Sequence, residues 1–344
     1  MLISVIIIAY NRKEFLKNAI RSVYTQLLDK GLYEVVIVKS FEDKDLDDYI
    51  AKLGYKNIIY DTPSYGERVS VGIEESKGEI LAFLEDDDEF KPNKLSKIYN
   101  VFSTQKEVSY FHDTREYIYN DKIVDINTKD PKISWIIRFL EEGTPHEDVL
   151  IDPFDKKMEK FLIKYNGTVA TVSLMTVRRI CIESRLNLLK QIKLDLEDFI
   201  PAFAAECGKL FHTADRLSRY RIHNKNMSIA LNEKDTERIL SFIIRGLNDY
   251  KIIINNISPK NRIRSVIKMR LLNAKLTLYN SPKEIKKKLG YKQNVLSVIK
   301  DRSELYLLTH DLHAYLSTLP YTIYNSIPSK RMKMLIKRIV KGAR

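Results

Sequence analysis

The sequence predicts an α/β fold in which a doubly wound, mostly parallel sheet is followed by a C-terminal helical extension. Through residues 1–90, short apolar runs rich in β-branched residues alternate with segments of helical periodicity, which is the strand–helix order of a parallel sheet. Beyond residue 230 the helical spacing continues without strand patterns, and the charge balance changes. We therefore expect one domain over residues 1–230 and a basic helical region over residues 231–344.

The first strand is expected at Ile3–Ala9, a continuous apolar run of the kind that is covered on both faces. Asn11, with Glu14 three residues later, has the pattern of a helix N-cap. Three further apolar segments, with helices between them, predict the next strands: Glu34–Val38, Asn57–Tyr60 and Glu79–Leu84. Because ligands bind beyond the carboxyl ends of parallel strands, we expect the loops after these strands to face a binding site.

The middle of the chain predicts one more helix and then strands of mixed direction. The helix is expected from Pro92, a favoured first helical residue, to about Phe102. The strands are expected at Val108–Phe111, Glu116–Tyr119, Lys122–Ile126 and Val169–Val177. Breaks in the C-terminal helical region are expected at its prolines: Pro259, Pro282, Pro320 and Pro328.

The composition favours an ordinary folded protein. Of the 344 residues, 44% are hydrophobic and 30% are charged. The two cysteines, Cys181 and Cys207, are too few for a disulfide framework and favour a reducing, cytoplasmic compartment. The chain has no apolar stretch of about 18 residues, so we expect no membrane-spanning helix.

The net charge of +13 is typical of a nucleic-acid-binding protein, but this charge is not spread evenly along the chain. Residues 231–344 hold 24 Lys and Arg against 8 Asp and Glu, a net charge of +16, which leaves −3 for residues 1–230. Nucleic-acid binding stays an alternative that rests on this charge alone. The folded part lacks interleaved aromatic and basic residues, so we expect no nucleic-acid partner.

A run of carboxylates, Glu85–Glu89, directly follows the apolar segment Ile80–Leu84. Such neighbours repel one another unless a cation or solvent takes up their charge. Carboxylate oxygens suit Mg²⁺ or Mn²⁺, and either ion would bridge to a diphosphate. The alternative is a solvated acidic loop that caps the helix after Pro92. The position after a buried strand favours the metal site.

Two motifs resemble family 2 of the inverting GT-A glycosyltransferases: SVIIIAYNR at Ser4–Arg12, and ILAFLEDDD at Ile80–Asp88 with Pro92-Asn93-Lys94-Leu95. The resemblance spans roughly residues 1–228 and implies a GT-A fold whose sheet binds a nucleotide sugar. The second motif matches the DxD region of the family, which implies that Asp87 and Glu85 contact Mn²⁺ or Mg²⁺. Further contacts to the nucleotide sugar are implied for Glu85, Asp86, Ala9, Tyr10 and Arg12.

Two positions depart from the family pattern. The family ends its second strand with aspartates that bind the nucleobase or ribose, whereas this chain has Lys39-Ser40. Lys39 is expected to approach a phosphate or an acidic sugar; otherwise Glu42 or Asp43 supplies the missing contact. Arg68 lies about one position from the arginine of the family and is expected to grip phosphate oxygens. A surface helix arginine is the alternative.

An inverting transfer needs a base on the acceptor side, opposite the departing diphosphate. Glu197-Asp198 resembles the Glu-Asp motif of the family, which implies that Asp198 is the general base and that Glu197 supports it. The alternative is a charged helix N-terminus that complements the helix dipole. Arg221 and His223 resemble the closing R-x-H stretch, and we expect them to contact the diphosphate or an adjacent carboxylate.

Residues 328–344 have the pattern of a basic amphipathic helix, with apolar residues at Met332, Leu335, Ile336, Ile339 and Val340. Such a helix can lie at a membrane surface, attracted by anionic headgroups. Packing against its own domain is the alternative. We therefore expect a cytoplasmic protein, with peripheral contact to the inner face of the cell membrane as one of two outcomes.

These observations predict an inverting, metal-dependent, hexosyltransferase-like enzyme of glycan or polysaccharide assembly. Its donor would be a UDP-, GDP- or dTDP-linked sugar, and its acceptor a hydroxyl or phosphate of a glycan or a lipid-linked molecule. The alternative, motivated by Lys39-Ser40, is a catalytically silent module that binds nucleotide sugars or scaffolds a glycan-assembly complex.

Overall fold

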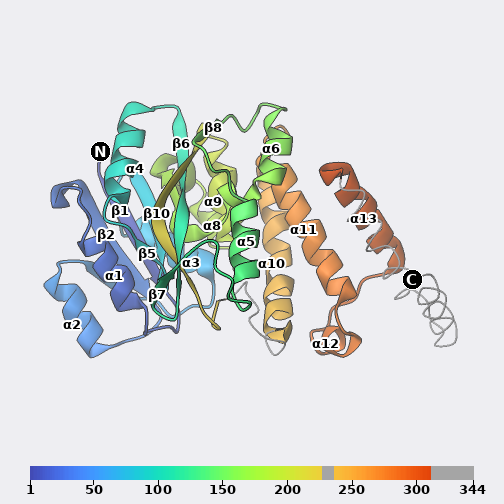
Figure 1. Cartoon of the computed structure of the whole chain (residues 1–344), viewed down its shortest axis with the longest axis horizontal. Coiled ribbons are helices and arrows are strands. Elements are labelled where there is room, and N and C mark those ends of the chain that lie inside the picture. Colours follow the sequence, from blue (N-terminus) through green and yellow to red (C-terminus); the bar gives the residue numbers. More distant parts are fainter. Residues whose placement is uncertain (227–235, 311–344) are drawn as a thin grey trace.

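The computed structural model describes residues 1–226 and 236–310, and within them a ten-stranded sheet forms the centre of the molecule (Figure 1). The strands are β1 (Ile3–Ala9), β2 (Tyr33–Lys39), β3 (Lys56–Ile59), β4 (Ile80–Glu85), β5 (Glu89–Phe90), β6 (Val108–Tyr119), β7 (Lys122–Val124), β8 (Val149–Ile151), β9 (Met175–Arg178) and β10 (Lys209–Ile222). The helices are α1 (Leu16–Tyr24), α2 (Lys44–Lys52), α3 (Tyr65–Glu74), α4 (Lys94–Thr104), α5 (Ser134–Glu142), α6 (Met158–Lys164), α7 (Arg179–Glu183), α8 (Leu186–Leu189), α9 (Leu196–Ala204), α10 (Thr236–Asn256), α11 (Ile263–Asn280), α12 (Lys283–Lys288) and α13 (Val295–Thr309). Short 3₁₀ turns are η1 (Lys30–Leu32), η2 (Asn166–Val169) and η3 (Val172–Leu174).

The sheet is parallel in its first half and mixed in its second, with the order β3-β2-β1-β4-β9-β6-β10-β5. Strand β1 pairs in parallel with β2 and β4, and β2 pairs in parallel with β3, as the alternation in residues 1–90 predicts. Strand β9 runs antiparallel to both of its neighbours, and β10 pairs in parallel with β6. The predicted α/β class with a doubly wound sheet is confirmed.

Helices cover both faces of the sheet, which is why the early strands are apolar throughout. Along β1, Val5 and Ile7 join a core that includes α1, α2 and α4, whereas Ile6 and Ile8 join a second core with α3 and α9. Side chains of α10 and α11, among them Ile253 and Val266, belong to this second core. Figure 1 shows α10 and α11 side by side next to the sheet domain.

Three local predictions were wrong. Asn11 does not cap a helix: it has a left-handed backbone (φ +57°), and α1 starts only at Leu16. The two strands expected within 108–119 are one continuous strand, β6. The strand expected over Val169–Val177 begins only at Met175, because Thr171 also has a left-handed backbone (φ +65°) that no strand accommodates, and 3₁₀ turns flank it on both sides.

The C-terminal region is helical through α13, and its helices are interrupted at Pro259 and Pro282 as predicted. The division of the chain at residue 230 stays a prediction. None of the helices in the described ranges has the length and apolarity that a bilayer crossing requires. Pro320, Pro328 and the amphipathic segment 328–344 lie outside the described residues.

Lys94, the lysine of the P-x-K-L motif, lies in the interior beneath the acidic loop. Its ammonium group is fully buried and donates hydrogen bonds to Asp113 (2.8 Å), the Ser218 hydroxyl (2.7 Å) and the Ser173 carbonyl (2.7 Å). The Asp113 carboxylate is fully buried as well. This ion pair therefore ties α4 to β6, β10 and the turn before β9.

We expect Lys94→Met to lower the free energy of unfolding by about 3–5 kcal/mol, because it leaves the buried Asp113 carboxylate without its cation. Urea unfolding followed by circular dichroism measures the change. Lys97→Met on the same helix is the matched control, since Lys97 and its partner Asp215 are both partly exposed. Such a pair contributes about 0–1 kcal/mol. Equal losses in the two variants would contradict a buried, structural ion pair.

Candidate active site

The acidic run predicted to bind metal leaves the sheet at the carboxyl end of β4. Because β1 and β4 are parallel neighbours, with Ile8 opposite Glu85, the loop after β1 meets the acidic loop at the same edge. The Tyr10 backbone N–H donates to the Asp86 carboxylate over 3.2 Å. The left-handed turn at Asn11 then lets Arg12 reach the acids, which is a local consequence of two adjacent parallel strands.

Three cationic or polar groups balance the charge of these carboxylates. Arg12 donates to Asp86 and, over 2.6 Å, to Asp87. The Nε2 atom of His223 lies 2.9 Å from the same Asp87 oxygen. Arg221 donates through its backbone N–H to Asp88 (3.0 Å) and through Nε to the Asp87 carbonyl (3.0 Å). Segments at the start and the end of the first 226 residues thus converge on one loop.

The environment divides the carboxylates by protonation. Burial and the neighbouring Asp87 raise the pKa of Asp86 to about 7 and that of Asp88 to about 8. For Asp87, burial acts in the opposite sense to the His223 hydrogen bond and the Arg12 charge, and the net effect lowers its pKa. Of these three aspartates, Asp87 is therefore the one whose ionised form the surroundings favour.

A divalent cation fits this loop. Glu85, Asp87 and Asp88 each offer an oxygen, and these atoms lie within 4.8 Å of one another. One Asp88 oxygen, Oδ2, is buried without a hydrogen-bond partner among the described residues. An orphaned carboxylate oxygen is costly unless a ligand completes it. Three carboxylates and no sulfur suit a hard ion such as Mg²⁺ or Mn²⁺.

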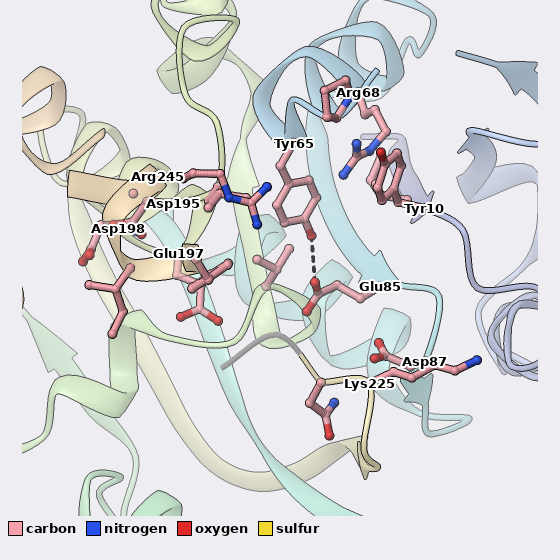
Figure 2. Close-up of a pocket in the computed structure, with 18 of the residues that line it drawn as sticks. Tyr10, Tyr65, Arg68, Glu85, Asp87, Asp195, Glu197, Asp198, Lys225 and Arg245 are labelled. Carbon is pink, nitrogen blue, oxygen red and sulfur yellow. Dashed lines mark hydrogen bonds between the residues drawn. The ribbon is translucent and has the colours of Figure 1, made fainter. Parts of the chain in front are cut away.

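A cavity of about 540 Å³ opens between the acidic loop and the start of α9. Its lining includes seven of the residues predicted for the site: Tyr10, Arg12, Arg68, Glu85, Asp87, Glu197 and Asp198. Figure 2 shows Glu197 and Asp198 on one side of this cavity and Glu85 and Asp87 on the other. The predicted metal contact and the predicted base thus share one cavity, although they are more than 100 residues apart in the sequence.

The carboxylates of α9 are held by the helix start and by a distant arginine. Asp195 is the N-cap, and its side chain accepts the Asp198 N–H over 3.2 Å. Asp198 is fully buried and accepts a hydrogen bond from Arg270 (2.7 Å), whereas Glu197 is half-buried. Burial raises the pKa of both Glu197 and Asp198.

Helix α3 supplies two further groups to the cavity. The Tyr65 hydroxyl donates to Glu85 over 3.1 Å, the dashed contact in Figure 2. Arg68 lies over the Tyr10 ring at 4.4 Å from its centroid, and its Nε atom is buried without a hydrogen-bond partner among the described residues. Gly66 lets the start of α3 pack closely against the end of α8, because a Cβ there would lie 2.0 Å from the Leu189 carbonyl oxygen.

The other five predicted residues do not line the cavity. Asp86 and His223 are instead hydrogen-bonded to two residues that do line it, Arg12 and Asp87 respectively, and Ala9 is buried at the end of β1. Arg221 donates its hydrogen bonds to the acidic loop and forms ion pairs with Asp121 and Glu89. Lys39 is fully buried and pairs with Asp47 over 2.8 Å, away from the cavity.

Several lining residues escaped the sequence analysis. They are Tyr65 on α3, Phe242, Arg245 and Tyr250 on α10, and Arg270 on α11. Asp88 was also assigned no metal contact, although it offers a ligand oxygen. The residues on α10 and α11 reach the cavity only through tertiary packing, so the local sequence carries no signal for them.

Comparison with known proteins places the chain among glycosyltransferases. A family model described as "Glycosyl transferase family 2" matches residues 4–180. An uncharacterized glycosyltransferase of Nostoc sp. is 36% identical over 141 residues, which are 39% of this chain and 43% of the relative. Protein CgeD of Bacillus subtilis is 24% identical over 148 residues, 40% of this chain and 33% of the relative. The chain spans less than half the length of these curated relatives.

Solved structures of S. aureus TarS share the fold. TarS 1–349 in complex with UDP matches with a TM-score of 0.53 at 12% identity, covering 100% of this chain and 92% of that chain. The complex with UDP-GlcNAc matches with a TM-score of 0.53 at 13% identity, over 100% and 93% of the two chains. At this identity the likeness shows the fold alone. It confirms the predicted GT-A fold with C-terminal helices.

We expect Mn²⁺ to raise the melting temperature of the chain, because the ion would relieve repulsion among Glu85, Asp87 and Asp88. At a concentration 100 times the dissociation constant, the gain would be about 2.7 kcal/mol. Asp87→Asn should lose most of this gain. The control Asp215→Asn changes an exposed acid elsewhere and should keep it. A thermal shift of equal size in Asp87→Asn and wild type would place the ion outside this loop.

Proposed function

The chain belongs to glycosyl transferase family 2, and we propose that it transfers a sugar from a nucleotide-diphosphate donor to an acceptor hydroxyl or phosphate with inversion at the anomeric carbon. One observation carries the proposal. The acidic loop after β4 and the carboxylates of α9 face each other across a single cavity. In-line displacement requires this arrangement, because the leaving group and the attacking group must stand on opposite sides of the reacting carbon.

On the donor side, Glu85, Asp87 and Asp88 would hold Mg²⁺ or Mn²⁺ against the diphosphate. The cation would supply charge neutralisation for the departing nucleotide. Arg12 stabilises the ionised form of Asp87, and Tyr65 orients Glu85 through its hydroxyl. Arg68, with its unsatisfied Nε, is placed to donate to a phosphate oxygen.

On the acceptor side, Asp198 would take the proton from the attacking hydroxyl. Its Oδ1 atom accepts the Arg270 hydrogen bond, whereas Oδ2 is buried without a partner among the described residues. An acceptor hydroxyl would satisfy that oxygen and be oriented by it. Glu197, half-buried at the cavity, would hold a second hydroxyl of the sugar or the acceptor.

We infer a UDP-linked sugar as the first donor to test, since the TarS structures of the same fold are complexes with UDP and UDP-GlcNAc. GDP- and dTDP-linked sugars follow. Lys39 is paired with Asp47 and absent from the cavity lining, so other side chains would contact the nucleobase. A glycan or lipid-linked acceptor, a cytoplasmic location and membrane contact through residues 328–344 remain expectations from the sequence.

A catalytically silent module that binds nucleotide sugars is the second candidate. The observation that favours it is that Lys39-Ser40 stands where the family has aspartates that bind the nucleobase or ribose. Without these contacts the donor would be held less firmly, which a binding or scaffold role tolerates better than catalysis does. Such a module would retain the cation site and the cavity. It would show no turnover with any donor.

We expect wild-type protein with Mn²⁺ to release nucleoside diphosphate from at least one UDP-, GDP- or dTDP-sugar, and Asp198→Asn to lower kcat by about 10²–10⁴-fold. The amide keeps an oxygen for Arg270, so the melting-temperature shift produced by the free nucleotide should be unchanged. A coupled assay that measures the release of nucleoside diphosphate gives kcat for both proteins.

Glu183→Gln is the matched control, because it removes an exposed carboxylate on α7 that is remote from the cavity lining. It should leave kcat at the wild-type value. Nucleotide binding by wild type without any release, and without a difference in Asp198→Asn, would select the silent module.

A further inference from the structure

The two long C-terminal helices make polar contacts with the segment that carries the predicted base. Asp249 of α10 accepts hydrogen bonds through one oxygen from three consecutive backbone N–H groups: Lys193 (3.0 Å), Leu194 (2.8 Å) and Asp195 (3.1 Å). These N–H groups immediately precede α9. A buried carboxylate on α10 therefore fixes where α9 begins, and with it the position of Glu197 and Asp198.

Arg270 of α11 is held by three acceptors. Its Nη1 atom donates to Asp198 (2.7 Å) and to the Val169 carbonyl (3.3 Å), and its Nη2 atom donates to the Asn166 carbonyl (2.9 Å). The two carbonyls belong to the turn η2 and fix the plane of the guanidinium group. Asp198 is consequently presented in one orientation, with Oδ1 occupied and Oδ2 left for another donor.

The surroundings of Asp198 make this cation necessary. Asp195 and Glu197 lie on the same helix start, and Tyr110 of β6 and Tyr250 of α10 are further titratable groups near it. Burial raises the pKa of Asp198, whereas the charge and hydrogen bond of Arg270 and a hydrogen bond with Asp195 act in the opposite sense, and Arg270 is the cation among these groups. A general base must be ionised before it can accept a proton.

We propose that Arg270 is the positioning residue of Asp198, so that the C-terminal helices are an integral part of the active site. The inference rests on the proposed function, because it assigns Asp198 the role of base. Arg270 also lines the cavity itself, as do Asp198 and Tyr250. Neither α10 nor α11 is covered by the family match, which ends at residue 180.

The first test follows the ionisation of Asp198 in the full-length chain. Carbon-13-labelled aspartate carboxyls are titrated by NMR, and Asp198→Asn identifies the Asp198 signal. In Arg270→Gln the carboxylate loses its opposite charge, so its pKa rises, and we expect its titration midpoint to move up by about one pH unit or more. The acid limb of kcat/KM should move up in parallel, since the ionised fraction falls at any given pH.

Lys268→Gln is the matched control. Lys268 lies on the same helix and pairs with Glu304 of α13, away from Asp198. It should leave both the Asp198 midpoint and the pH profile unchanged. Arg270→Lys keeps the charge but lacks the second nitrogen that bonds to Asn166, so we expect a wild-type acid limb, a lower kcat and an unchanged KM.

The outcomes separate this inference from the proposed function. An Asp198 midpoint that is the same in Arg270→Gln and wild type overturns the role of Arg270. If Arg270→Gln does not fold, a wild-type kcat in Arg270→Lys overturns it instead. Wild-type protein that transfers no sugar, together with an upward midpoint shift in Arg270→Gln, rejects the proposed function and retains the ion-pair assignment.

Discussion

The structure depends on burying carboxylates of like charge at the edge of a sheet. Glu85 to Asp88 follow the most deeply buried part of β4, where desolvation and mutual repulsion both oppose ionisation. Hydrogen-bond donors from other segments stabilise the loop. Arg12 comes from the end of β1, and Arg221 and His223 come from the end of β10. The contacts that stabilise the loop therefore also fix the ends of three strands.

This requirement explains the sheet topology around the site. Strand β1 must be the parallel neighbour of β4, because only then do the two carboxyl ends lie together and place Arg12 beside Asp86 and Asp87. Strand β10 pairs with β5 through Ser218 and Arg219, two residues before Arg221. Lys94 and Asp113 form a buried ion pair beneath the same region. The order of the strands thus brings to the acidic loop the groups that balance its charge.

The sequence was sufficient for the parts that depend on local pattern. Apolar runs predicted β1, β2, β3 and β4, and the position of the acids after β4 predicted the edge at which a ligand would bind. It failed where long-range contacts decide. Lys39 resembled a ligand-binding cation, yet Asp47 of the following helix neutralises it in the interior. For Arg221, which was expected to contact the diphosphate or an adjacent carboxylate, the structure shows carboxylate contacts, to Asp121 and Glu89.

On the proposed acceptor side, too, a buried carboxylate is paired with an arginine from a distant segment of the chain. A basic extension beside a slightly acidic domain suggests two regions with separate tasks. Yet Arg270, from that basic extension, pairs with the buried Asp198 as Arg12 pairs with Asp87. Each carboxylate cluster of the cavity is thereby paired with an arginine from a segment distant in sequence, which no single stretch of the chain can reveal. Because residues on both sides of residue 230 line the cavity, a domain boundary drawn there from composition alone would divide that lining.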